Sequence, residues 1–432
     1  FGAEPMSLKN RNIPEDLREQ GKLLSARFLG VCDSAGINLS AYDLSVTEVA
    51  WTTSPFIAEN AIADPKWFIE EILDSPVSAR PASYYREQVS TNLATAHNPM
   101  LAYSQLRTFR NREIARIAWR DIIGGVDVVD ITAELSDFAD ACVAGAVSWT
   151  AEQLRERFGV PLDSQGRPLS LVTIAMGKLG GRELNFSSDI DLIFAFPRSG
   201  YTKGGTREVS HQEFFDRQSK LLIGLLNEPT SDGFVFRVDM RLRPFGDSGP
   251  PTSNFDALEH YYQLHGRDWE RYALIKARTI TGARADQETL NALLKPFVYR
   301  RYLDYGALEA VREMKGLINA EVARKELPYD VKLGAGGIRE IEFIGQTLQL
   351  IRGGREQRLQ QRSILGVLAA AASLNLLDEK DSSALTLAYL FLRRVEHRLQ
   401  QVSDQQTHRL PTLPNEQSRL AYAFDVDTYA QF

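Results

Sequence analysis

Apolar residues recur at helical spacing near both ends of the chain. The clearest segments of this kind are 50–67, 84–96, 107–123, 130–158, 338–351, 364–377 and 382–401. Apolar residues three and four positions apart form one face of an amphipathic helix. The pattern therefore predicts helical regions on both sides of a differently organised middle.

The middle of the chain contains three short apolar runs of the kind that form strands. They lie at 171–176, 189–196 and 234–242, and a helix is expected over 210–226 between the last two. In the third run apolar and polar residues alternate, which places them on opposite faces of a strand. Its apolar face would carry Phe234, Phe236, Val238, Met240 and Leu242, and its polar face Arg237, Asp239, Arg241 and Arg243.

The succession of elements predicts an α+β protein that is mostly helical. We expect an N-terminal helical region over 1–124, a catalytic domain with the strands over 125–285, and a C-terminal helical domain over 286–432. A chain of 432 residues is long enough for two or three domains.

Composition narrows the class of protein. Hydrophobic residues make up 44% and charged residues 25%, which is ordinary for a globular chain. The net charge of −6 argues against a general nucleic-acid binder. The segment 364–377 is too short to span a membrane, and Cys32 and Cys142 fit no metal-ligand spacing. We expect a cytoplasmic protein that binds neither membrane nor nucleic acid.

The chemistry is concentrated between Met176 and Phe194. Asp189 and Asp191 would project to one face of a strand, and two such carboxylates suit a hard cation such as Mg²⁺. The preceding glycines, Gly177, Gly180 and Gly181, would let the backbone approach a phosphate. Asp239, with arginines on the same face, is a third carboxylate for a site that holds metal and phosphate together.

Other charged segments have simpler interpretations. A second Asp-x-Asp, at 425–427, follows no glycine loop and is expected to be a solvated turn. The basic helix 107–123 is expected to carry a solvated face. That face would contain Arg107, Arg110, Arg112, Arg116 and Arg120. The histidines at 211, 260, 265 and 397 are expected to be structural or surface groups. If Asp239 belonged to no site, the polar face of its strand would simply face water.

The spacing of glycines and carboxylates resembles a known superfamily. Gly180-Gly181, seven residues, Asp-x-Asp and a later Asp are similar to the nucleotidyltransferases related to DNA polymerase beta. Four longer motifs resemble the bifunctional glutamine synthetase adenylyltransferase/adenylyl-removing enzymes. They read GKLGGRELNFSSDIDLIF at 177–194, DGFVFRVDMRLRPFGDSGP at 232–250, GRDWERYALIKAR at 266–278 and KLGAGGIREIEFIGQ at 332–346.

The resemblance implies a fold, a reaction and a set of site residues. That family carries two nucleotidyltransferase halves, each with a small mixed sheet, and the wording at 183–188 and 334–343 is similar to the amino-terminal, adenylyl-removing half. The implied reaction is phosphorolysis, in which orthophosphate removes AMP from a tyrosine of glutamine synthetase and gives ADP. The implied partners are glutamine synthetase, the PII signalling protein, ADP or ATP, and orthophosphate.

Within this chain the resemblance assigns the following residues. Asp189, Asp191 and Asp239 would be catalytic and would hold Mg²⁺, as two ions. The nucleotide and phosphate would be bound by Gly177, Gly180, Gly181, Ser188, Arg241 and Arg243. The roles of Lys178 and Arg182 stay open. The loop 334–337 is either an anion site at the start of a helix or a tight loop between domains.

Three other functions are compatible with parts of this pattern. The same carboxylates would serve the opposite reaction, ATP-dependent adenylylation of the tyrosine. A uridylyltransferase acting on PII is a related possibility, although the His-Asp doublet of its usual hydrolase segment is missing. A non-catalytic module that binds PII or the synthetase would have no need for three carboxylates beside a glycine loop.

Overall fold

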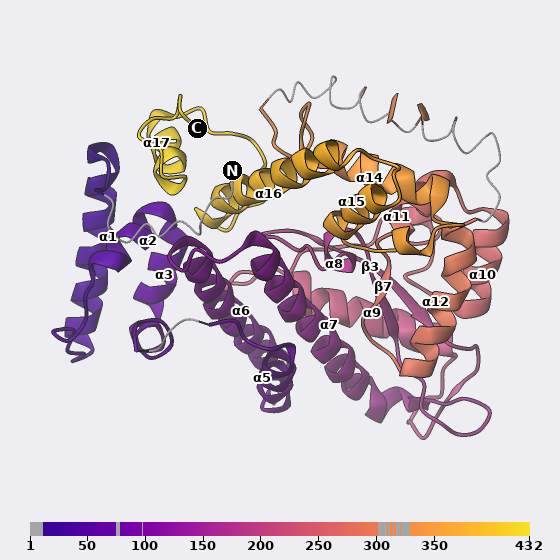
Figure 1. The fold of residues 1–432 in the computed structure, drawn as a ribbon. Helices are drawn as coiled ribbons and strands as arrows, with labels where there is room; N and C mark the ends of the chain where they lie inside the picture. Colours follow the sequence, from indigo (N-terminus) through magenta and orange to yellow (C-terminus); the bar gives the residue numbers. More distant parts are fainter. Residues whose placement is uncertain are drawn as a thin grey trace.

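The structure is a computed structural model that describes residues 12–74, 78–96, 98–300 and 329–432, together with residues 309, 312, 313, 315, 316 and 320. The described part is mostly helical, with small sheets, which confirms the predicted α+β class (Figure 1). Its N-terminal helices are α1 (Glu15–Ser34), α2 (Ser45–Thr53), α3 (Pro55–Ala63), α4 (Pro65–Phe68), a π-helix (Ile69–Leu73), α5 (Ala82–Ala94), α6 (Pro99–Ile122) and α7 (Val128–Phe158).

The middle of the chain supplies the strands and the helices that cover them. The strands are β1 (Val160–Pro161), β2 (Val172–Ala175), β3 (Ile190–Phe196), β4 (Thr202–Lys203), β5 (Val238–Asp239), β6 (Thr252–Asn254) and β7 (Arg278–Thr279). The helices are α8 (Gly177–Gly180), α9 (His211–Asn227), a 3₁₀ turn (Gly246–Ser248), α10 (Phe255–Leu264), α11 (Asp268–Leu274) and α12 (Arg284–Val298).

The C-terminal part is helical, as its apolar spacing predicts. It contains α14 (Ile338–Arg352), a 3₁₀ turn (Gln357–Leu359), α15 (Ile364–Ser373), α16 (Glu379–Gln401) and α17 (Pro414–Ala423). Helix α16 runs across the α8 end of the sheet, and α17 returns toward α2 (Figure 1).

The main sheet is mixed and is centred on β3. Strand β2 pairs with β3 antiparallel, and β7 pairs with β2 antiparallel. On its other side β3 pairs in parallel with β5 at its start and with β6 at its end. A separate two-stranded sheet joins β1 and β4.

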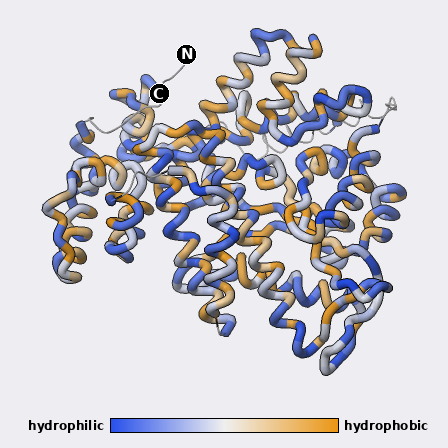
Figure 2. Tube along the Cα trace, turned by 60° about the horizontal axis from the view of Figure 1, so that its bottom comes forward, coloured by the Kyte–Doolittle hydropathy of each residue, from blue (hydrophilic) through white to orange (hydrophobic). Residues whose placement is uncertain are grey.

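The two faces of the main sheet are covered by different helices. Leu192 and Phe194 belong to a core that also contains residues of α1 to α7 and α9, whereas Ile193 and Ala195 belong to a core with α10 to α12. Because side chains alternate along a strand, the buried run of β3 serves both cores. A third core joins α14, α15 and α16. Figure 2 shows apolar and polar positions alternating along the surrounding helices.

The strand expected over 234–242 is wrong in length. Only Val238 and Asp239 are in a strand, and the neighbours Val235 and Phe236 are both buried rather than on opposite faces. The N–H groups of Val235 and Phe236 both donate to the carbonyl oxygen of Leu226, at the end of α9, so this segment caps a helix. After Met240 the chain turns, because the Arg243 N–H donates back to the Met240 carbonyl at 3.1 Å.

The prediction that helix 107–123 carries a solvated basic face is also wrong. Arg107, Arg110, Arg116 and Arg120 are each at most 5% exposed, and Arg112 alone of this set is not buried. Arg107 donates to the carbonyl oxygens of Gly233 and Leu225, at 2.9 and 3.1 Å. The others pair with carboxylates, Arg110 with Asp404 and both Arg116 and Arg120 with Glu134. The arginines thus tie α6 to distant segments instead of facing water.

Smaller expectations are confirmed. Cys32 and Cys142 are free and buried, and residues 425–427 lie in an exposed turn region after α17. His211 is buried against the carbonyl oxygens of Arg198 and Tyr201, and His397 against Asp121. Within the described ranges, no helix has the length and apolar character needed to cross a membrane.

Candidate active site

The sheet brings the three predicted carboxylates to one edge. Asp189 immediately precedes β3 and Asp191 lies on it, so both side chains project to the same face. The parallel register of β3 and β5 places Asp239 directly beside Asp191. We call Asp189, Asp191 and Asp239 the carboxylate edge.

Arginines contact two of the three carboxylates. Arg237 Nε donates to Asp189 Oδ1 at 2.6 Å, and the same guanidinium donates to the Ser187 carbonyl oxygen. Arg241 Nε donates to Asp239 Oδ2 at 2.8 Å. Within the described ranges, no Lys, Arg or His side chain lies within ion-pair distance of Asp191.

The electrostatics of the edge differ from one carboxylate to the next. Burial raises the pKa of Asp191 to about 6, and the negative charges of Asp239 and Asp189 act in the same direction. Burial would also raise the pKa of Asp239, but hydrogen bonds from Arg241 outweigh it and hold that pKa below its ordinary value. Asp191 is therefore the carboxylate whose charge is least compensated.

Gly177 is the glycine that touches this edge. Its φ is +54°, and a Cβ atom there would lie 2.5 Å from Asp191 Oδ2. A side chain at this position would therefore collide with the carboxylate.

Gly180 and Gly181 were expected to bring the backbone close to a phosphate, but their contacts are with the protein itself. A Cβ at Gly180 would lie 2.0 Å from the Lys276 carbonyl oxygen. The N–H groups of Gly180 and Gly181 donate to the carbonyl oxygens of Met176 and Gly177, which leaves them no free hydrogen for a phosphate. Close packing accounts for these two glycines.

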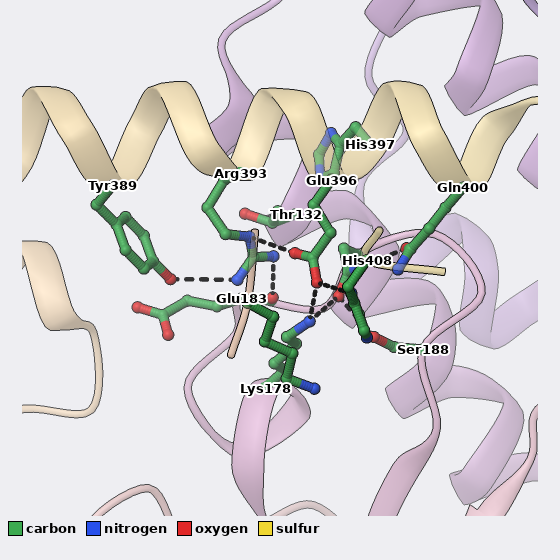
Figure 3. Close-up of polar contacts among 12 residues, drawn as sticks. Thr132, Lys178, Glu183, Ser188, Tyr389, Arg393, Glu396, His397, Gln400 and His408 are labelled. Carbon is green, nitrogen blue, oxygen red and sulfur yellow. Dashed lines mark hydrogen bonds and ion pairs between the residues drawn. The ribbon is translucent and has the colours of Figure 1, made fainter. Parts of the chain in front are cut away.

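Lys178 and Ser188 lie in a buried polar cluster beneath α16 (Figure 3). Lys178 Nζ lies 2.7 Å from Glu396 Oε1 and donates to Asn185 Oδ1 at 2.6 Å. Ser188 Oγ donates to the same Asn185 oxygen at 2.5 Å. Burial lowers the pKa of Lys178 to about 7, against the opposing effect of Glu396.

A second buried ionic cluster, of one lysine and two glutamates, lies next to Lys178. Lys276 Nζ bridges Glu183 Oε2 at 2.8 Å and Glu342 Oε1 at 2.6 Å. From α16, Arg393 donates to the Glu183 carbonyl oxygen at 2.6 Å. The buried-charge network, as we call it, consists of Lys178, Glu183, Lys276, Glu342, Arg393 and Glu396.

The remaining cations predicted near the site have local partners. Arg243 Nη1 donates to the Met240 carbonyl oxygen at 2.9 Å and lies 3.3 Å from Asp247 Oδ1. Arg182, half exposed, pairs with Asp137 at 2.8 Å. Of the predicted phosphate-binding arginines, Arg241 is the one whose side chain is mostly exposed, at 76%.

The loop 334–337 immediately precedes α14. The Gly336 N–H donates to Glu340 Oε2 at 2.8 Å, and Gly337 N–H donates to the Gly334 carbonyl oxygen. These bonds are those of a tight loop. Just before it, the charge of Lys332 lowers the pKa values of both Asp191 and Lys178. The motif at 332–346 begins at this lysine, but its pattern gave no reason to place it near Asp191.

The donor set of the edge suits a hard divalent cation, since Mg²⁺ prefers carboxylate oxygens. As the side chains stand in the described part of the chain, no three His, Cys, Asp or Glu groups are arranged to hold one ion. Asp189 and Asp239 are instead paired with Arg237 and Arg241. A metal at this edge would have to replace contacts that these arginines now make.

Fold and site together define a class: a mostly helical α+β protein whose small mixed sheet is of the nucleotidyltransferase type. The family model for glutamate-ammonia ligase adenylyltransferase matches residues 45–292, and a model for GlnD PII-uridylyltransferase matches residues 312–432. The chain belongs to the glutamate-ammonia ligase adenylyltransferase family. All three edge carboxylates lie within the region that this family model matches.

A curated relative extends the match to nearly the whole chain. The chain is 48% identical over 422 residues to a bifunctional glutamine synthetase adenylyltransferase/adenylyl-removing enzyme of Thioalkalivibrio sulfidiphilus. The match covers 97% of this chain and 43% of the relative. The chain therefore spans less than half the length of that protein.

Proposed function

We propose that this chain removes AMP from an adenylylated tyrosine of glutamine synthetase by phosphorolysis, with ADP and unmodified synthetase as products. The observation that carries the proposal is the parallel register that sets Asp191 beside Asp239 and next to Asp189. In a member of an adenylyltransferase family, a cluster of carboxylates at a sheet edge fits the handling of a phosphodiester. The similarity of 183–188 and 334–343 to an adenylyl-removing half favours this direction.

Mg²⁺ is part of the proposal, and Asp189, Asp191 and Asp239 would hold it. When bound, it would neutralise charge on the phosphodiester and on the entering phosphate, which otherwise repel each other. The elevated pKa of Asp191 supports this assignment, because an uncompensated carboxylate gains most from a nearby cation.

The chain's own residues would orient the phosphates around that edge. Arg241 is exposed and already contacts Asp239, so its guanidinium can turn to a phosphate oxygen without leaving the site. The leaving tyrosine is a phenolate with a pKa of ~10, which needs less protonation than an alkoxide. The proposed step therefore requires no histidine, and His397 is buried against Asp121.

The opposite reaction is the second candidate. The relative's printed name carries both an adenylyltransferase and an adenylyl-removing activity, and this chain covers less than half of that protein. The same carboxylates would serve ATP-dependent transfer of AMP to the tyrosine. Regulation by a PII protein is a further part of the proposal.

The test is to incubate the chain with adenylylated glutamine synthetase, Mg²⁺ and orthophosphate and to identify the released nucleotide by chromatography. ADP release that depends on orthophosphate supports phosphorolysis. Equal release of AMP without orthophosphate contradicts it. Faster adenylylation of unmodified synthetase from ATP favours the opposite reaction.

A further inference from the structure

The segment that leads into the carboxylate edge has an unusual backbone conformation at Ser187. This residue lies two positions before Asp189, its φ is +48°, and it is buried. A serine rarely adopts this left-handed conformation unless its surroundings hold it there, and residues held in this way cluster at active sites. The contacts of Ser187 therefore also fix the point at which the chain enters β3.

Two side chains contact Ser187, at different atoms. Its hydroxyl donates to Asp404 Oδ1, in the loop after α16, and its carbonyl oxygen accepts from the Arg237 guanidinium. Arg237 Nε also donates to Asp189 Oδ1 at 2.6 Å, and the Arg237 carbonyl oxygen accepts from the Ile190 N–H at 2.8 Å. Asp404 is thus one hydrogen bond away from the segment that starts β3.

Arg110 connects Asp404 to the second strand of the edge. Its Nη2 donates to Asp404 Oδ1 at 3.0 Å, and its Nε donates at 3.2 Å to the carbonyl oxygen of Val235, three residues before β5. The two side chains of this ion pair are only 3% and 12% exposed, so salt screens it weakly. One ion pair therefore joins the segments that enter β3 and β5, the strands whose parallel register places Asp191 beside Asp239.

The loop that carries Asp404 is itself anchored at the junction of α2 and α3. The Ser54 hydroxyl donates to the Gln401 carbonyl oxygen at 2.5 Å, and the Phe56 N–H donates to the Val402 carbonyl oxygen at 3.2 Å. Asp404 has a φ of +50°, a conformation that aspartate tolerates better than most residues. The backbone beside this carboxylate is therefore fixed by contacts from outside the sheet.

We propose that Asp404 is a positioning residue for the carboxylate edge and acts through Ser187 and Arg110. By holding the segments that enter β3 and β5, it would keep the three edge carboxylates in the arrangement that binds a divalent cation. Asp404 itself would touch neither the cation nor the phosphates. The inference rests on the proposed function for the role of that cation, and it deepens that function by giving the loop after α16 a part in it.

The test compares Asp404→Ala with Asp404→Asn, with Ser187→Ala and with the double variant of Asp404→Ala and Ser187→Ala. The matched control is Glu134→Ala, because Glu134 is a buried carboxylate that pairs with Arg116 and Arg120 of the same helix, α6. Three properties of the full chain are measured. They are the affinity for Mn²⁺ by electron paramagnetic resonance, kcat for ADP release at fixed Mg²⁺, and the thermal unfolding midpoint.

Loss of a group that orients metal ligands is expected to weaken Mn²⁺ binding by roughly 10- to 100-fold in Asp404→Ala, with a parallel fall in kcat. Asp404→Asn keeps an oxygen that can accept from Ser187 and should recover part of the loss. Adding Ser187→Ala to Asp404→Ala should change little, because both substitutions remove the same hydrogen bond. Glu134→Ala should lower the unfolding midpoint but leave Mn²⁺ affinity within a few-fold of the parent.

Four results would overturn the inference. Two concern Asp404→Ala: Mn²⁺ affinity equal to that of the parent, or a loss no larger than that of Glu134→Ala at a similar unfolding midpoint. The others are additive effects of Asp404→Ala and Ser187→Ala, and a parent chain that binds no Mn²⁺. The Mn²⁺ measurement also separates this inference from the proposed reaction. If the parent binds Mn²⁺ but releases no ADP from modified synthetase, phosphorolysis fails, while Mn²⁺ binding still tests Asp404.

Discussion

The carboxylate edge and the buried-charge network are neighbours, joined at Gly177 and Lys178, yet they balance charge in different ways. In the network three cations meet three carboxylates, and each ion lies within reach of an opposite charge or a carbonyl oxygen. At the edge Asp191 has no such partner within the described ranges, and its pKa is raised to about 6.

The difference separates a scaffold from a site. A buried ion pair is tolerable when each charge is compensated, so the network fixes the glycine loop beneath α16. An uncompensated carboxylate costs stability, and such groups cluster where a ligand supplies the missing charge. The two regions should therefore respond in opposite ways to loss of one charge.

The largest expected effect is on turnover at the edge. Asp191→Asn and Asp189→Asn remove a carboxylate charge at nearly constant size and should each lower kcat by roughly 10²- to 10³-fold, the usual cost of losing one preorganised electrostatic group. Steady-state deadenylylation at saturating Mg²⁺ measures this. The matched control is Asp256→Asn, an exposed aspartate in the first turn of α10. Near-parental turnover in either edge variant would remove that residue from the proposed metal site.

The next effect is on stability in the network. Glu396→Gln leaves Lys178 and Arg393 without their carboxylate, and breaking a buried pair costs roughly 3–5 kcal/mol. Urea unfolding measures it. Adding Lys178→Met to this variant should recover part of the loss, because one of the stranded cations is removed. If the two changes are simply additive, the charges are not coupled as described.

A smaller change in the free energy of unfolding, opposite in sign to that of Glu396→Gln, is expected for Asp191→Asn. Because its folded pKa is raised to about 6 from 3.8, its contribution favours the folded state at low pH and is lost as the pH rises through about 6. At pH 8 without divalent cations, Asp191→Asn should raise the free energy of unfolding by roughly 1–3 kcal/mol. The gain should vanish near pH 4. A loss of stability at pH 8 would mean that the charge is already compensated.

Much of the fold could be predicted because its signals are local. Helix α7 was expected over 130–158 and is found over 128–158, and the buried run of β3 was expected within one residue of its start. The alternation of apolar and polar residues over 234–242 predicted a strand that is too long. A segment that caps α9 and then turns can show the same alternation as a strand.

Long-range partners explain the other misses. Arg110 is buried because Asp404 lies beside it, nearly three hundred residues along the chain, and no local pattern reveals that pairing. The partners of Lys178 and Ser188 were missed for the same reason. Glu396, which pairs with Lys178, and Gln400, which contacts the Asn185 side chain that Ser188 bonds, both come from α16. The carboxylate edge itself was predictable, because Asp189 and Asp191 share a strand and Asp239 stood out within an apolar run.

The most direct test of the central claim follows the atoms of orthophosphate. The chain is given adenylylated glutamine synthetase, Mg²⁺ and oxygen-labelled orthophosphate, and the nucleotide product is examined by phosphorus NMR. Phosphorolysis predicts ADP with the label in its β-phosphate and in the oxygen that bridges the two phosphorus atoms, and no such product with Asp191→Asn. Unlabelled AMP as the product, formed equally well without orthophosphate, would contradict the account.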